Sequence, residues 1–196
     1  MSIEPASTTH WTRHPLRDAD MIPRFRRFLE TRKPCRVLEM GAKRWDEARC
    51  TLHKQWLPEW AEFVGTDFID GQDVDVVADA HTMSEVFGES TFDALISISV
   101  FEHITRPWIA AAEVAKVLKP GGQALIHVPF AFPEHGYPSD YFRFTKQGLR
   151  VIFEDAGLET LACDYEAPCW IQSDADPAIG GVECFSAARL LARKPD

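Results

Sequence analysis

Short apolar runs alternate with amphipathic stretches along most of the chain. Five of the runs predict buried strands, at residues 35–40, 62–67, 74–79, 91–99 and 123–128. The amphipathic stretches carry apolar residues at helical spacing and predict helices, at residues 17–32, 44–57, 82–88 and 106–119. Strands that alternate with helices in this way predict an α/β fold with a doubly wound parallel sheet.

The pattern changes after the fifth strand. Residues 129–144 are rich in proline and aromatic residues and have no clear period. A segment this long without regular structure inside a compact domain is typically functional, and we interpret it as an insertion that caps the substrate. A helix is predicted at 145–157, and strands are predicted at 158–166 and near 182–192. The loop between these two strands is too short for a helical crossover, so we expect them to pair antiparallel.

One domain is expected over residues 17–196, because no linker or internal repeat divides this part of the chain. Residues 1–16 contain two prolines and no apolar period, and we interpret them as a flexible N-terminal segment or a lid over the pocket. The five cysteines include no CxxC pair, and a disulfide scaffold is not expected in a chain of this size.

The charge and hydropathy of the chain narrow the class of partner. The formal net charge is −9, whereas proteins that bind nucleic-acid phosphates rely on clustered Lys and Arg, so no nucleic-acid partner is expected. No apolar run approaches the roughly 20 residues that a membrane-spanning helix needs. The N-terminal stretch has no apolar signal core. We therefore expect a cytoplasmic protein without membrane contact.

Acidic side chains lie at the carboxyl ends of the first three predicted strands. Glu39 and Gly41 close the first strand, Asp67 ends the second, and Asp79 ends the third. In an open α/β sheet, ligands bind in the crevice outside these strand ends. The pattern therefore predicts a nucleotide-binding sheet.

Several segments together carry a family resemblance. The segments VLEMG, GTD, ADA, FDALISISVFEH and VLKPGG, with a C-terminal strand that ends in ARKP, resemble the class I S-adenosylmethionine-dependent methyltransferases. The resemblance covers roughly residues 35–194 and is to the small single-domain branch that modifies sugars, lipids or other small metabolites. It implies a Rossmann-like sheet of seven strands, mostly parallel with an antiparallel last strand, and helices on both faces. It also implies S-adenosylmethionine as cofactor and S-adenosylhomocysteine as product.

The resemblance implies a cofactor role for each matching residue. Gly41 lets the backbone approach the methionine part of the cofactor, and Glu39 orients its ammonium group. Asp67 accepts hydrogen bonds from both ribose hydroxyls, because a carboxylate offers two acceptor oxygens. Asp79 lies near the adenine amino group, and its alternative role is as N-cap of the following helix. The remaining cofactor-binding positions are Phe68, Ala80, His81 and Ser99.

The loop after Gly41 departs from the family pattern. The family has two further glycines at alternate positions, where this chain has Lys43 and Trp45. Two alternatives therefore stay open: an enzyme of the same fold that uses the cofactor for a reaction other than methylation, and a non-catalytic assembly subunit that has lost the cofactor site. A nicotinamide-dependent dehydrogenase is disfavoured, because its GxGxxG signature is absent.

Candidate catalytic residues follow the fourth and fifth strands. Glu102 and His103 follow the fourth strand, and His135 lies in the irregular segment. We expect these three residues to act in catalysis, because imidazole titrates near neutral pH and accepts a hydroxyl proton. The alternative for His103 is a structural role in fixing its loop. The expected substrate contacts are Tyr137, Asp140, Tyr141 and Arg143, although the pair Asp140 and Arg143 equally fits an internal ion pair that braces the segment.

The Glu102–His103 pair, taken with His135, is also similar to a pattern in the metal-dependent methyltransferases. There, a Glu-His pair after strand four and a later histidine hold a divalent cation that lowers the pKa of the acceptor hydroxyl. That pattern has a further glutamate three residues before the pair, where this chain has Ser99. Because one carboxylate is missing, we expect no bound metal, and Glu102, His103 and His135 are the residues that would hold one.

These features together predict an S-adenosylmethionine-dependent methyltransferase that acts on a small molecule. An oxygen acceptor is expected, on a sugar or a natural-product-like metabolite. A hydroxyl acceptor needs a base, and the candidate histidines can supply one. The expected oligomeric state is a monomer or a homodimer.

Overall fold

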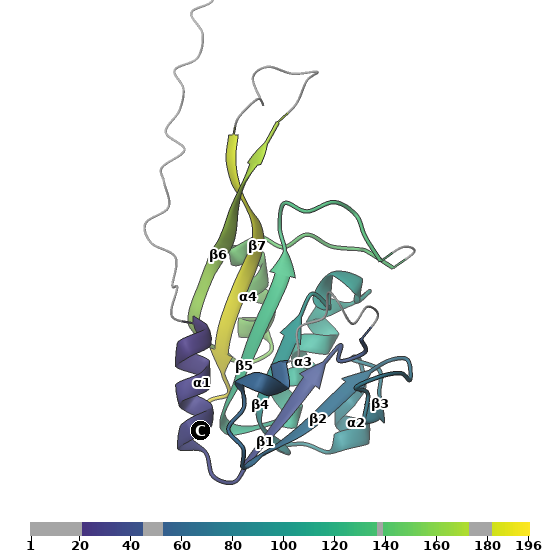
Figure 1. Ribbon diagram of the computed structural model, residues 1–196, viewed down its shortest axis with the longest axis vertical. Helices are drawn as coiled ribbons and strands as arrows, with labels where there is room; N and C mark the ends of the chain where they lie inside the picture. Colours follow the sequence, from purple (N-terminus) through teal and green to yellow (C-terminus); the bar gives the residue numbers. More distant parts are fainter. Residues whose placement is uncertain (1–20, 45–52, 137–138, 173–181) are drawn as a thin grey trace, which may run out of the picture.

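The computed structural model describes residues 21–44, 53–136, 139–172 and 182–196. Within these residues, seven strands form one sheet in the order β3-β2-β1-β4-β5-β7-β6 (Figure 1). The strands are β1 Cys35–Met40, β2 Ala61–Asp67, β3 Val76–Val77, β4 Phe92–Ile98, β5 Leu118–Pro129, β6 Glu159–Ile171 and β7 Val182–Arg193. Strands β1 to β5 pair in parallel, whereas β7 is antiparallel to both β5 and β6. The predicted α/β class and the antiparallel last strand are confirmed.

Helices cover both faces of the sheet. Helix α1 (Met21–Thr31) buries Met21, Phe25 and Leu29, which are spaced as one face of a helix, against one face of the sheet. Helices α2 (Met83–Phe87), α3 (Pro107–Val117) and α4 (Lys146–Asp155) cover the opposite face. Successive strand residues point to opposite faces, so Val37 lies in the core with α1 and Leu38 lies in the core with the other three helices.

Several predicted bounds are wrong. Leu118 directly follows helix α3 and begins β5, so residues 120–122 form a bulge within the strand and not a turn before it. Strand β3 keeps only two residues of the predicted 74–79, and β6 continues to Ile171 beyond the predicted end at 166. In the described part of the predicted helix 44–57, the regular structure is a 3-10 turn, η1 (His53–Trp56). Residues 45–52 and 1–16 lie outside the described residues.

The segment between β5 and α4 has the irregular structure that its sequence predicts. Its described parts, residues 130–136 and 139–144, contain no helix or strand. Figure 1 shows the segment running beyond the carboxyl end of β5 before it returns to α4. The backbone N–H of Phe130 donates to the carbonyl of Ser186 at 2.8 Å, and that of Phe144 donates to the carbonyl of Pro129 at 3.1 Å. No helix in the described part of the chain has the length and apolarity to cross a membrane.

Candidate functional site

The carboxyl ends of β1 to β4 lie at one edge of the sheet, and the strand order reverses between β1 and β4. Open α/β sheets bind ligands at such a switch point. The backbone N–H groups of Gly41 and Ala42 donate to the carbonyl of Thr66 at 2.8 and 3.0 Å, which holds the loop after β1 against β2. A Cβ at Gly41 would lie 2.2 Å from Cγ2 of Val100, so glycine is required where the turns after β1 and β4 approach one another.

Asp67 ends β2 at this edge of the sheet and is only 8% exposed. Its Oδ2 atom accepts from the backbone N–H of Lys43, and its Oδ1 atom accepts from that of Ile69, both at 3.3 Å. Lys43 stands at one of the family's glycine positions and still offers its backbone N–H to the loop. The neighbouring Phe68 is exposed. Trp45, at the other glycine position, lies outside the described residues.

Glu39 is paired with a residue that was not predicted for the site. Its Oε1 atom lies 2.6 Å from Nδ1 of His53, and both residues are buried. The ring of His53 packs edge to face against Trp56. Glu39 therefore has one carboxylate oxygen engaged within the protein, at the end of β1.

Asp79 and His81 form a local pair after β3. Oδ1 of Asp79 accepts from the backbone N–H of His81 at 2.9 Å and lies 2.7 Å from its Nδ1 atom. The hydrogen bond from this backbone N–H holds the pKa of Asp79 below its ordinary value. The N-cap of α2 is Thr82, so the alternative role of Asp79 as the N-cap is wrong. Ala80, between the pair, is half-buried against the core.

Ser99 opens the turn after β4 in an unusual backbone conformation. It is an exposed residue with a φ of +55°, and its backbone N–H donates to the carbonyl of His127 at 2.9 Å. A non-glycine residue in this region costs about 1–3 kcal/mol, which the surrounding hydrogen bonds must offset. The turn leads directly into the 3-10 turn η2 (Phe101–His103), which carries two of the predicted catalytic residues.

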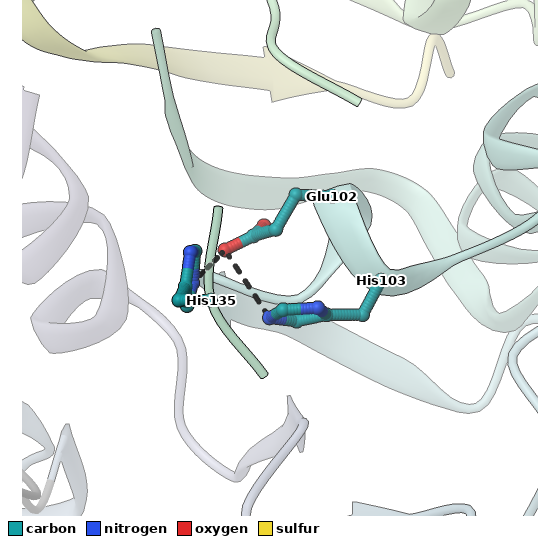
Figure 2. Close-up of side chains that lie close together, drawn as sticks. All are labelled: Glu102, His103 and His135. Atoms are coloured by element: carbon teal, nitrogen blue, oxygen red, sulfur yellow. Dashed lines mark ion pairs between the residues drawn. The ribbon is translucent and has the colours of Figure 1, made fainter. Parts of the chain in front are cut away.

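Three titratable side chains converge beside this turn, as Figure 2 shows. Glu102 and His103 lie on η2, and His135 comes from the segment after β5. Oε1 of Glu102 lies 3.7 Å from Nε2 of His103 and 3.6 Å from Nε2 of His135. The two imidazole rings meet edge to face with their centroids 4.9 Å apart. All three predicted catalytic residues thus form one group, called here the Glu-His-His cluster.

The carboxylate of Glu102 is buried without a hydrogen-bond partner. Its side chain is 0% exposed, and neither oxygen has such a partner among the described residues. Burial raises the pKa of Glu102 to about 7, and the negative charge of Asp140 acts in the same direction. A buried polar group in this state costs free energy unless another group satisfies it. The cluster is therefore a place where a proton or a cation is expected.

Both imidazole rings have a fixed orientation. Nδ1 of His103 lies 2.8 Å from the carbonyl oxygen of Ser139, and Nδ1 of His135 lies 3.2 Å from that of Pro133. Because a carbonyl oxygen only accepts, Nδ1 carries the hydrogen in each ring. In the neutral rings, Nε2 then has a lone pair that faces Glu102. The imidazole side chains are 28% and 34% exposed, so the cluster is open on one side.

The segment after β5 approaches η2 closely at two points. The backbone N–H of Tyr141 donates to the carbonyl of Glu102 at 2.7 Å. Gly136 has a φ of +62°, and a Cβ there would lie 2.8 Å from Cε1 of His103. Glycine at this position therefore allows the segment to lie against the imidazole ring.

An ion pair inside the segment positions His135. The guanidinium of Arg143 donates to the two oxygens of Asp140 at 2.6 and 2.5 Å, and the Asp140 side chain is 1% exposed. This guanidinium holds the pKa of Asp140 well below its usual range. Asp140 also accepts from the backbone N–H of His135 at 2.7 Å. These hydrogen bonds hold the segment in place around His135. Substrate contact by Asp140, Arg143 and the half-exposed Tyr141 stays a prediction, and Tyr137 lies outside the described residues.

A second polar group lies across β5, β7 and β6. Nε2 of His127 lies 2.6 Å from Oε1 of Glu166, and the same carboxylate pairs with the guanidinium of Arg189. Glu166 and Arg189 were not predicted for the site, and His127 was a candidate at the end of the fifth predicted strand for which a structural role was favoured. No motif or period links them, because they are brought together only by the register that pairs His127 with Arg189 across β5 and β7.

Comparisons with known proteins agree with this architecture. Residues 48–126 match the family model described as a methyltransferase domain, and no curated protein matches the sequence. A putative methyltransferase from Bacillus halodurans is 16% identical, with 90% of this chain and 100% of that chain covered and a TM-score of 0.62. A SAM dependent methyltransferase from Archaeoglobus fulgidus is 19% identical, with 88% and 92% covered and a TM-score of 0.60. The 1,6-didemethyltoxoflavin-N1-methyltransferase of Burkholderia thailandensis, with 1,6-didemethyltoxoflavin and S-adenosylhomocysteine bound, is 16% identical, with 89% and 78% covered and a TM-score of 0.60.

The strand order and the antiparallel β7 define the Rossmann-like fold of the class I methyltransferases, which the solved structures share. The family model adds that residues 48–126, less than half of the chain, are similar to the methyltransferase domain family.

Proposed function

We propose that the protein transfers the methyl group of S-adenosylmethionine to an oxygen atom of a small molecule, such as a hydroxyl of a sugar or of a natural-product-like metabolite. The observation that carries this proposal is the Glu-His-His cluster, which lies just after β4 at the edge of the family's cofactor crevice. A hydroxyl is a poor nucleophile until it loses its proton, and the cluster offers groups that favour that loss. The Burkholderia thailandensis structure, which holds a small-molecule ligand with S-adenosylhomocysteine, supports a small acceptor in a fold of this shape.

In this proposal the cofactor lies along the ends of β1 to β4. Asp67 binds the ribose, since each of its oxygens accepts one long hydrogen bond within the described chain and keeps the capacity to accept another. Glu39 and Gly41 contact the methionine part. Asp79 binds the adenine amino group, and the other cofactor contacts are Phe68, Ala80, His81 and Ser99. When bound, S-adenosylmethionine supplies a methyl group on a sulfonium: the acceptor oxygen forms the C–O bond as the C–S bond breaks, and sulfur keeps that electron pair.

The chain's own residues orient the acceptor and favour removal of its proton. The Nε2 lone pairs of His103 and His135 lie within reach of the same acceptor oxygen, because both rings face Glu102. The carboxylate of Glu102 stabilises positive charge that develops at this point. The segment after β5 supplies His135 and shields the site on the side of η2, where Tyr141 donates to the backbone of Glu102.

Calorimetric titration tests the cofactor site. S-adenosylmethionine and S-adenosylhomocysteine are expected to bind in the micromolar range, about −8 kcal/mol. Asp67→Ala is expected to weaken binding by at least about tenfold, because it removes charge-assisted hydrogen bonds to the ribose. The matched control is Asp70→Ala, which removes an exposed carboxylate three residues further along the same loop and is expected to leave the affinity unchanged. Folded wild-type protein that binds neither compound would favour the non-catalytic alternative.

Transfer of a radioactive methyl group from S-adenosylmethionine tests the reaction. The acceptors are a panel of sugars and phenols, with matched amines in which nitrogen replaces the oxygen. His103→Ala and His135→Ala are each expected to lower turnover by about 10²-fold or more, with cofactor affinity unchanged. Turnover that survives both changes within a few-fold contradicts the catalytic assignment. Methylation of the amines alone contradicts the oxygen acceptor.

A further inference from the structure

The Glu-His-His cluster brings three acceptor atoms together around one point. Oε1 of Glu102 lies 3.7 Å from Nε2 of His103 and 3.6 Å from Nε2 of His135, and one possible ligand atom from each of the three residues lies within 4.8 Å of the other two. Figure 2 shows the carboxylate pointing from η2 toward both rings. The carboxylate is fully buried, and neither of its oxygens has a hydrogen-bond partner among the described residues. The carboxylate oxygen and the two ring nitrogens all carry lone pairs, so they repel one another unless a positive group lies between them.

The hydrogens of the two rings point away from this centre. His103 donates through Nδ1 to the carbonyl of Ser139, and Nδ1 of His135 has two acceptors, the carbonyl of Pro133 at 3.2 Å and Oδ2 of Asp140 at 3.3 Å. Nη2 of Arg143 also lies 3.4 Å from this Nδ1, but it already donates to both of those acceptors. A carbonyl or carboxylate behind an imidazole is the usual second partner of a histidine that binds a metal.

The distances fit a metal ion. A single water molecule has two hydrogens and cannot donate to three acceptors, and one shared proton satisfies only one pair. Ligand atoms bound at about 2.1 Å to a tetrahedral cation lie about 3.4 Å apart. The distances from Glu102 to the two Nε2 atoms, 3.7 and 3.6 Å, are close to this value.

We propose that the Glu-His-His cluster binds one divalent transition-metal cation, such as zinc, cobalt or manganese, through Oε1 of Glu102 and Nε2 of His103 and His135. Two imidazoles and one carboxylate favour these ions over magnesium, which prefers oxygen ligands. The sequence favoured no metal because Ser99 replaces a carboxylate, but three protein ligands suffice for a catalytic metal site and leave a position open.

The open position would take the oxygen of the methyl acceptor, and this step rests on the proposed function. With the cation bound, the Nε2 lone pairs of His103 and His135 would be its ligands and would no longer accept the hydroxyl proton. The cation itself would lower the pKa of the bound hydroxyl, so the proton would pass to water near neutral pH. The oxygen then uses its electron pair to form the C–O bond to the methyl group. The C–S bond breaks, and its electron pair remains on sulfur.

Titration of the metal-free full-length protein with Co²⁺ tests the site without any need for activity. We expect one Co²⁺ per chain, with a visible absorption band that Zn²⁺ abolishes by competition. Glu102→Gln, His103→Ala and His135→Ala are each expected to weaken binding by at least tenfold. The matched control is His127→Asn, which removes a histidine from another His–Glu pair. Because Nε2 of His127 and Oε1 of Glu166 already contact each other at 2.6 Å, this change is expected to leave Co²⁺ binding intact.

The outcomes separate the metal site from the reaction. Wild-type protein that binds Co²⁺ no better than the His103→Ala/His135→Ala double variant would overturn the proposal, as would an equal loss in His127→Asn. Because Glu102→Gln preserves the shape of the side chain, unchanged Co²⁺ binding in this variant also overturns it. Stoichiometric binding without methyl transfer would support the metal site and contradict the proposed function. Cofactor binding and methyl transfer that persist in protein that binds no Co²⁺ would support the proposed function and contradict the metal site.

Discussion

Gly136 decides how closely the segment after β5 can approach His103. Its φ of +62° and the 2.8 Å distance from an added Cβ to Cε1 of His103 predict that Gly136→Ala displaces the ring or the segment. We expect Co²⁺ affinity and methyl transfer to fall by about tenfold, together with about 1–2 kcal/mol of the free energy of unfolding. Co²⁺ titration and urea denaturation measure these changes.

Gly157→Ala is the control for this change. Gly157 has a φ of +86°, and an added Cβ would have no neighbour within 4 Å. The control is expected to lose similar stability from backbone strain while it keeps the full Co²⁺ affinity. Equal Co²⁺ affinity in the two variants would mean that contact with Gly136 does not position His103.

His127 is predicted to make stability depend on pH. Burial lowers the pKa of His127 to about 4 from an ordinary value of 6.5, and the charges of Arg189 and His53 act in the same direction. The carboxylate of Glu166 accepts from the neutral ring and shares its charge with Arg189. The folded state thus disfavours protonation of His127. The stability that this neutral ring provides is complete above pH 6.5 and is lost as the pH falls toward 4.

Urea denaturation of the wild type and His127→Asn across this range measures the effect. The difference between their free energies of unfolding is expected to change by about 3 kcal/mol between pH 7 and pH 4. Parallel curves for the two proteins would contradict the prediction.

Residues could be predicted for the site where a strand end or a motif marked them. Glu102 and His103 lie in the turn after a buried strand, and His135 lies in a segment with no regular period, so the sequence alone predicted all three. His53 could not be found in this way, because its partner Glu39 lies on another element. The contact depends on the position of η1 relative to β1, which no local sequence pattern indicates.

At the scale of elements, the segment after β5 depends on the Asp140–Arg143 pair. Arg143→Leu leaves a carboxylate whose side chain is 1% exposed without its counter-charge, whereas Asp140→Asn removes the charge itself. We therefore expect Arg143→Leu to cost about 3 kcal/mol and Asp140→Asn about 1 kcal/mol. Hydrogen exchange at residues 130–136 and 139–144 is expected to speed up most in Arg143→Leu.

The double variant Asp140→Asn/Arg143→Leu checks the cause. Without the buried charge, it is expected to be more stable than Arg143→Leu alone. A double variant that is less stable than either single variant would show that packing by these side chains, and not charge, holds the segment.

The elements themselves were predictable where the apolar period was strong. The runs at β1, β2 and β4 gave bounds within a residue of those observed. At β5, the sequence predicts a turn at residues 120–122, because Pro-Gly-Gly is a strong turn signal. In the structure, pairing with β4 accommodates these residues as a bulge. Strand β6 extends past its predicted end because β7 pairs with it as far as Ile171, and a strand partner from a later part of the chain leaves no local signal.

At the scale of the whole molecule, ligands at the two proposed sites should stabilise one cooperative fold. S-adenosylhomocysteine at about 100 times its Kd is expected to raise the free energy of unfolding by about 2.7 kcal/mol, or the melting temperature by about 5–11 °C for a protein of this size. The cofactor position proposed at Asp67 and the metal position at Glu102 share no protein group. The stabilisation by S-adenosylhomocysteine and that by Co²⁺ are therefore expected to add within about 0.5 kcal/mol.

Thermal melts of two variants distinguish independent sites from a single one. Asp67→Ala is expected to lose only the shift caused by S-adenosylhomocysteine, and Glu102→Gln only the shift caused by Co²⁺. This pattern is specific, because a variant that merely loosens the sheet edge would weaken both shifts together. Loss of both shifts in either variant would therefore contradict two independent sites, and the stability of that variant without ligand would distinguish a coupled site from a loosened sheet edge.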